Sequence, residues 1–160
     1  MNIFDFAMEK EKYSEDYYRQ LAAKSGDKGL ARIFNMLADE EAKHYKIVSE
    51  MKKDIASDLA ETKVLSDAKD VFEQMRESAR SLNFNISQVE LYKKALKIEE
   101  QSRDFYLEKA EEVSEIQKEI FLKLADEEKK HYFLLENIID FVSRPQTWLE
   151  NAEFYHLEEY

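Results

Sequence analysis

The sequence predicts an all-α protein, an antiparallel bundle of four long helices with one long crossover and a short C-terminal extension. Three observations lead to this prediction. The chain has 160 residues, enough for one domain with its own core, but only two Gly and one Pro, so turns are few. Apolar residues recur at spacings of three and four through four long segments, as in amphipathic helices. Residues 55–86 separate the second segment from the third.

Start and stop signals mark the ends of the expected helices. Asp27 is the expected N-cap of the second helix, and capping-box sequences begin at Ser87 and Ser114, before the third and fourth. Pro145 ends the fourth. The helices are expected at residues 2–25, 28–54, 87–112 and 115–143.

Loop lengths set the expected topology. The first and third loops are only a few residues long, so each must join an antiparallel helical hairpin. Residues 55–86 can carry the chain along the length of the bundle, with a short helical pattern over 66–80 that turns Val71, Phe72 and Met75 inward. One long crossover between two hairpins is therefore expected.

The end of the chain is expected to form an extension to the bundle. The bundle is assigned to residues 1–144 and the extension to residues 145–160. Trp148, Phe154 and Tyr155 make this extension too aromatic to leave in water, so it is expected to pack on the bundle or on a partner subunit.

The two halves of the sequence resemble each other. Residues 34–48 read FNMLADEEAKHYKIV, and residues 121–135 read FLKLADEEKKHYFLL. The helices that precede these segments also agree. Two similar hairpins favour a pseudo-two-fold arrangement in which matched residues meet across the axis.

Each inward stripe is apolar except near its middle, where a carboxylate lies, and the second and fourth helices add an imidazole one turn later. Four carboxylates in one core need compensating charge, and no Lys or Arg lies near them on these stripes. Two divalent metal ions would balance four Glu, and this ligand chemistry suits iron or manganese. Without metal, burial and mutual repulsion are expected to raise the pKa of all four carboxylates. The six side chains are Glu11, Glu41, His44, Glu99, Glu128 and His131.

A Glu from each of two helices, with Glu-x-x-His from each of the other two, resembles the ferritin-like di-iron carboxylate proteins. The similarity is to their rubrerythrin and bacterioferritin branch, over residues 3–143. It implies two iron ions bridged by Glu41 and Glu128. Each ion would also take one carboxylate and one imidazole from Glu11, Glu99, His44 and His131.

The resemblance implies an oxidoreductase, a non-haem di-iron peroxidase or ferroxidase that reduces hydrogen peroxide or O2 or oxidises ferrous iron. Several departures narrow this expectation. The chain has no Cys, so it lacks the rubredoxin-like domain and any iron–sulfur cluster, and an external electron donor is expected. Ser102 stands where rubrerythrin has an extra carboxylate. Ala42 stands where bacterioferritin has its haem-ligating Met, so no haem is expected. The family also implies a homodimer.

Two tyrosines are candidate catalytic residues. Tyr18 and Tyr106 lie seven residues after Glu11 and Glu99, so each phenol is expected to reach a carboxylate at the site and orient it. Simple aromatic packing is the alternative reading. The third histidine, His156, also has a Glu three residues earlier, but it lies off the long apolar stripes, so this match is interpreted as coincidence.

The remaining sequence properties exclude some functions and leave others open. The formal net charge of −11 argues against nucleic acid. No long uncharged apolar run predicts a membrane span, and the N-terminus has acidic residues where a signal peptide would be basic, so a cytoplasmic protein is expected. An iron-storage shell and a structural bundle without turnover remain alternative functions.

Overall fold

The fold was obtained as a computed structural model, which describes residues 2–56, 58–77, 82, 84 and 88–160. These parts of the chain contain helices and connecting segments and no strand, as predicted. Every helix among them is too short or too polar to cross a membrane. The four long helices are α1 (Ile3–Lys24), α2 (Lys28–Lys52), α4 (Gln88–Lys109) and α5 (Glu115–Ser143).

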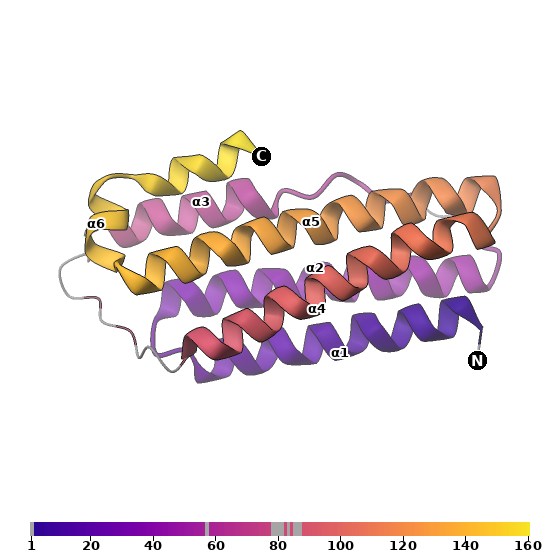
Figure 1. The fold of residues 1–160 in the computed structure, drawn as a ribbon, viewed down its shortest axis with the longest axis horizontal. Helices are drawn as coiled ribbons and strands as arrows, with labels where there is room; N and C mark the ends of the chain where they lie inside the picture. The colour runs from indigo at the N-terminus through magenta and orange to yellow at the C-terminus, as the bar shows by residue number, and fades with distance from the viewer. Residues whose placement is uncertain (1, 57, 78–81, 83, 85–87) are drawn as a thin grey trace.

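The long helices form two antiparallel hairpins (Figure 1). α1 packs along α2, and α4 packs along α5. The chain leaves α2 at one end of the bundle and starts α4 at the other, so the crossover returns along the bundle's length. This is the predicted ferritin-like connectivity.

The capping signals act as expected where the structure describes them. The Asp27 side chain accepts a hydrogen bond from the backbone N–H of Leu30 at 2.8 Å. Ser114 and Gln117 make both bonds of a capping box at the start of α5. Ser87, the predicted cap of the third helix, lies outside the described residues.

Some helix ends differ from the prediction. α2 stops at Lys52 rather than at residue 54, because Asp54 adopts a left-handed φ of 56° that a right-handed helix cannot contain. α4 stops at Lys109 and continues as a short 3-10 turn, η2 (Ala110–Glu112). α5 ends before Pro145 as expected, but this proline also begins a further short helix, α6 (Pro145–Glu150).

The crossover contains the expected short helix, α3 (Val64–Met75). Its buried face includes Val71, Phe72 and Met75, as the pattern predicted. α3 contacts α2 and α5 and also the end of the chain. The predicted helical segment extended to residue 80, but residues 78–80 lie outside the described part of the chain.

The C-terminal extension folds back over α3 as α6 and a 3-10 helix, η3 (Glu153–Glu159) (Figure 1). Trp148 and Phe154 are buried, and the Trp148 ring lies edge-on to Phe72 with centroids 4.6 Å apart. Tyr155 differs, because it remains 44% exposed and lies beside the Lys69 ammonium group. The extension therefore packs on its own bundle through two of the three predicted aromatic residues.

Two apolar clusters fill the bundle on either side of its centre. One includes Phe34, Phe72 and Trp148 and reaches the end covered by the extension. The other includes Val48 and Phe121 and fills the opposite end. Between these clusters the inward positions are polar, and this layer is the candidate site.

Candidate metal centre

The six side chains predicted from the sequence meet in the middle of the bundle. All six are at most 1% exposed. They form two overlapping groups, and within each group the potential ligand atoms lie within 4.8 Å of one another. The first group is Glu11, Glu41, His44 and Glu128, and the second is Glu41, Glu99, Glu128 and His131.

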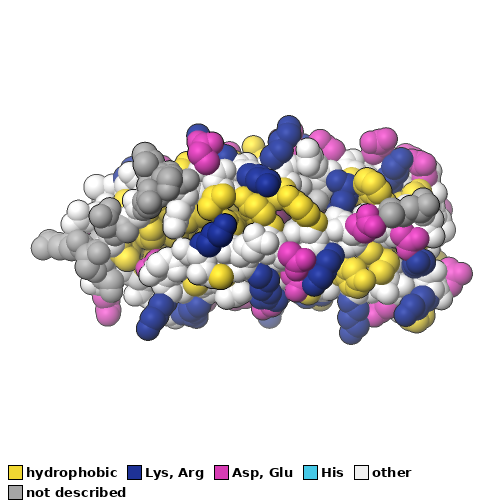
Figure 2. Space-filling view, turned by 90° about the horizontal axis from the view of Figure 1, so that it is seen from below, with side chains coloured by type: hydrophobic (Ala, Val, Ile, Leu, Met, Phe, Trp, Pro, Cys, Tyr) yellow, Lys and Arg dark blue, Asp and Glu magenta, His cyan; other side chains and the backbone are white. Residues whose placement is uncertain are grey.

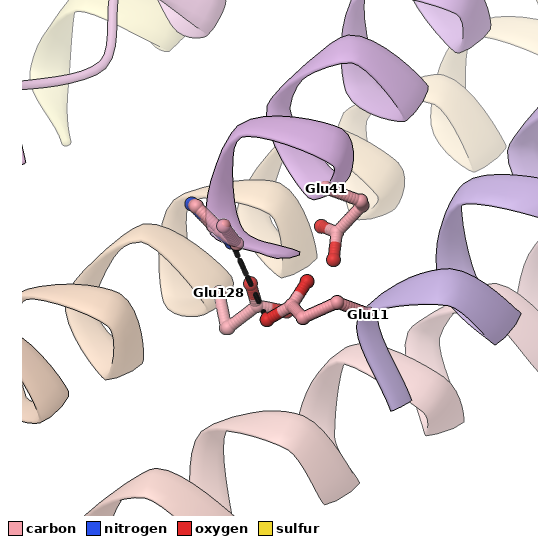
Figure 3. A group of neighbouring side chains, drawn as sticks. Glu11, Glu41 and Glu128 are labelled. Atoms are coloured by element: carbon pink, nitrogen blue, oxygen red, sulfur yellow. Dashed lines mark ion pairs between the residues drawn. The ribbon is translucent and has the colours of Figure 1, made fainter. Parts of the chain in front are cut away.

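Two carboxylates belong to both groups. Glu41 comes from α2 and Glu128 from α5, and Figure 3 shows them pointing toward each other and toward Glu11 on α1. The rings of His44 and His131 lie parallel, with centroids 5.8 Å apart. The internal repeat therefore places its matched residues around one shared centre.

The donor atoms of this centre are incompletely satisfied by the protein. Each of the four carboxylates has at least one buried oxygen without a hydrogen-bond partner, both oxygens of Glu128 lack one, and His44 Nδ1 lacks one as well. In the described part of the chain, the ion pairs of the four carboxylates are with His44 and His131 alone. Unsatisfied buried oxygens are costly unless a cation meets them, so these residues fit a pair of metal ions.

Tyr18 and Tyr106 each reach a site carboxylate, and each does so across the bundle. The Tyr106 hydroxyl donates to Glu11 Oε1 at 2.6 Å, and the Tyr18 hydroxyl donates to Glu99 Oε1. Each phenol therefore holds a carboxylate of the other hairpin. Burial raises the pKa of both tyrosines, and the charge of the Glu partner raises it further, so both hydroxyls stay protonated as donors.

Two further carboxylates, Glu40 and Glu127, lie behind the histidines, and Glu127 is close enough to hydrogen-bond its ring. His44 Nε2 lies 2.7 Å from Glu127 Oε1, and His131 Nε2 lies 3.7 Å from Glu40 Oε1. Such a partner fixes the orientation of an imidazole. The sequence reasoning missed both residues, although the doubled Glu in each repeat was the signal that could have identified them.

The opposite nitrogen of each ring, Nδ1, faces the centre. His44 Nδ1 lies 2.9 Å from Glu128 Oε1 and 3.5 Å from Glu11 Oε1. His131 Nδ1 lies 2.8 Å from Glu41 Oε1 and 3.4 Å from Glu99 Oε1. Each ring thus faces one carboxylate that both groups share and one carboxylate that belongs to its group alone.

The pKa values of the four carboxylates divide into two pairs. Burial raises the pKa of Glu41 and Glu128, and the charges of the neighbouring carboxylates raise it further. Burial also acts to raise the pKa of Glu11 and Glu99, but the charge of the adjacent imidazole and the hydrogen bonds to each carboxylate together outweigh it, and their pKa values are lowered. The expectation that all four would be raised is therefore wrong for Glu11 and Glu99.

The imidazoles account for this division. Burial acts to lower the pKa of His44 and His131, but the charges of Glu11 and Glu99 raise it well above its ordinary value. Without metal, the directions of these shifts favour two imidazolium ions that face two ionised carboxylates, with protons on the two shared carboxyl groups. In that protonation state the formal charge of the centre is zero, as it is with two divalent ions bound to four carboxylates.

His156 lies away from this centre. Its side chain is 58% exposed on η3, and its Nδ1 pairs with Glu159 at 3.0 Å. Glu153, the residue that completed the chance motif, pairs instead with Arg144.

A bundle of two helical hairpins with this buried carboxylate and imidazole centre is a ferritin-like protein with a site that can hold metal. The family model for rubrerythrin matches residues 2–139, so the chain belongs to the rubrerythrin family. Among curated proteins and solved structures, none matches it significantly.

Proposed function

We propose that this protein is a di-iron oxidoreductase that reduces hydrogen peroxide or O2. The observation that carries this proposal is the overlap of the two ligand groups. Because Glu41 and Glu128 belong to both groups, they are suited to bridge two ions. A site for a single ion would need only one of the groups.

The ligand chemistry favours iron. Each ion would take three carboxylates and one imidazole, a hard oxygen set with one nitrogen, which suits iron or manganese. Structural zinc takes four ligands in a closed tetrahedral site and has no need of the shared pair. Glu11 and His44 would complete one ion's ligands, and Glu99 and His131 the other's.

The protein's own groups hold this site in one geometry. The protonated phenols fix Glu11 and Glu99, and Glu127 fixes the ring of His44. A bound pair of ferrous ions would supply the two electrons that an oxygen–oxygen bond needs for reduction. Reduction of hydrogen peroxide to two waters consumes two electrons and two protons, so continued turnover needs an external electron donor.

A test starts from protein loaded with two ferrous ions under nitrogen. Added peroxide should oxidise the iron within the mixing time of a stopped-flow experiment, and an added reductant should restore the ferrous form. Glu128→Gln should lose this reaction, whereas Glu136→Gln, an exposed site on the same helix, should keep it. Protein that purifies with zinc and stays unreactive would contradict the proposal and favour a structural bundle.

Oxidation of ferrous iron for storage is the related alternative function. The oligomeric state distinguishes a storage protein from a peroxide-reducing enzyme. We propose a homodimer, as the family resemblance implies. Light scattering of the iron-loaded protein should give a dimer mass. A large hollow shell would instead favour storage.

A further inference from the structure

A groove between α1 and α4 leads toward the metal centre. It has a volume of about 280 Å³, and its lining includes Phe6, Lys10, Tyr13, Ser14 and Ser102. Figure 2 views the molecule from the side on which α1 lies and shows hydrophobic side chains exposed among charged ones.

Two small residues form the deep end of this groove. Ser14 and Ser102 are 1% and 3% exposed and also line the groove. Each lies three residues after a site carboxylate, Glu11 or Glu99, which is about 4.5 Å along the helix axis. The two serines occupy matched positions in the internal repeat, and each lies about one helical turn from a ligand of the centre.

The Ser14 hydroxyl has no hydrogen-bond partner in the protein. A buried hydroxyl without a partner is uncommon, because the lost hydrogen bonds to water are not replaced. This group can both donate and accept a hydrogen bond. It is therefore available to a small polar molecule that enters the groove.

The mouth of the groove favours an uncharged molecule. Phe6 and Tyr13 are 46% and 53% exposed there, and Lys10 lies over the Phe6 ring at 5.4 Å. The only formal charges in the lining, those of Glu9 and Lys10, cancel. An apolar rim without net charge does not concentrate ions.

A second groove differs from the first in the charge of its lining and in the side chain that lies between it and the centre. It is lined by four acidic and two basic side chains, and it ends on Glu127. Behind Glu127 lies the fully buried ring of His44, which is bonded to that carboxylate. A reactant could reach the centre through this groove only by separating Glu127 from His44.

We propose that hydrogen peroxide reaches the centre through the groove between α1 and α4, passing between Ser14 and Ser102, and that the Ser14 hydroxyl binds it. Peroxide is small and uncharged, and it donates and accepts hydrogen bonds, as this path requires. The inference rests on the proposed function, since it assumes iron at the centre.

Two substitutions of Ser14 test the path and the binding by its hydroxyl separately. Ser14→Leu fills the path and should slow the association of nitric oxide, a small uncharged probe, with the diferrous protein by about tenfold or more, followed by absorbance. Ser14→Ala keeps the path open, so nitric oxide should bind at the wild-type rate. This variant removes only the hydroxyl, so it should raise KM for peroxide and leave kcat unchanged.

Control variants show whether the proposed function, the path or the role of the hydroxyl is wrong. Ser102→Leu should repeat the effect of Ser14→Leu, and Leu122→Trp, which fills the second groove, should leave nitric oxide association unchanged. Iron content is measured first. Wild-type protein without iron would refute the proposed function itself. Iron-loaded Ser14→Leu and Ser102→Leu with wild-type nitric oxide rates would overturn the path alone. An unchanged KM in Ser14→Ala would overturn peroxide binding by its hydroxyl, even if the leucine variants fail to fold.

Discussion

The two halves of the metal centre are nearly equivalent in their ligands but differ in what lies behind them. His44 Nε2 lies 2.7 Å from Glu127, whereas the matched pair, His131 and Glu40, is separated by 3.7 Å. Both outer carboxylates line grooves at the surface. Glu40 also accepts hydrogen bonds from Thr62 in the crossover and from Lys43.

This difference shows where the internal symmetry ends. The repeat supplies two equal sets of ligands, but one chain has only one crossover, and its described residues bond to only one of the two outer carboxylates. Burial acts to raise the pKa of Glu40, but the nearby imidazole of His131 and the hydrogen bond from Thr62 lower it to about 2. We therefore expect the His44 side to bind its ion with the better-oriented imidazole.

The largest expected effect concerns the shared ligands. Glu41→Ala or Glu128→Ala should reduce the metal content from two ions per chain to less than one, because each residue contacts both ions in the proposed site. Glu11→Ala or Glu99→Ala should lose only one ion. Elemental analysis after gel filtration measures this, with His156→Ala as a control that should keep both. Equal losses from all four glutamates would show that no ligand is shared.

A smaller effect should distinguish the two outer carboxylates. Glu127→Gln should weaken binding of one ion by about 10- to 100-fold, because it removes the charged partner of His44. Glu40→Gln should weaken binding less, since Glu40 lies farther from His131. Cobalt(II) titrations followed by visible absorption measure both affinities. Equal weakening would show that the crossover does not make the halves unequal.

The two tyrosines should be equivalent. Tyr18→Phe and Tyr106→Phe each remove a hydrogen bond to a carboxylate, so each should lower the free energy of unfolding by about 1.5–3 kcal/mol. Chemical denaturation of the metal-free variants gives this quantity. A clear difference between the two variants would extend the asymmetry into the centre itself.

The smallest expected effect is the response of the metal-free fold to pH, in which both halves of the centre act together. Because the raised pKa values exceed the ordinary 4.5 and 6.5, proton binding stabilises the metal-free fold, and this stabilisation is lost as pH rises through the raised values. The lowered pKa values of Glu11 and Glu99 act oppositely, but only as pH falls below about 4.5. The groups with raised pKa are Glu41, Glu128, His44 and His131.

The metal-free protein should therefore become more stable as the pH falls from neutral toward about 5. Bound metal should reverse the trend, because acid competes for the ligands. Thermal melts of both forms across this range measure the gap between them. A gap that does not widen toward higher pH would contradict the assignment of these ligands.

The repeat and the helical spacing were enough to predict the fold and the six central side chains. They could not show which hairpin each phenol bonds to, because the Tyr18–Glu99 contact depends on how the hairpins meet. Glu40 and Glu127 were missed because each precedes a central Glu and faces another direction on the helix. The division of the carboxylate pKa values depends on distances to His44 and His131, which spacing alone does not give.

The most direct test of a two-ion centre is a calorimetric titration of the metal-free protein with ferrous iron under nitrogen at neutral pH. Repeating it in buffers of different ionisation enthalpy gives the number of protons released. Two protonated carboxyl groups and two imidazolium ions must each lose a proton, so the account predicts two ions per chain and about four protons released. Binding of a single ion, or of two ions without proton release, would contradict it.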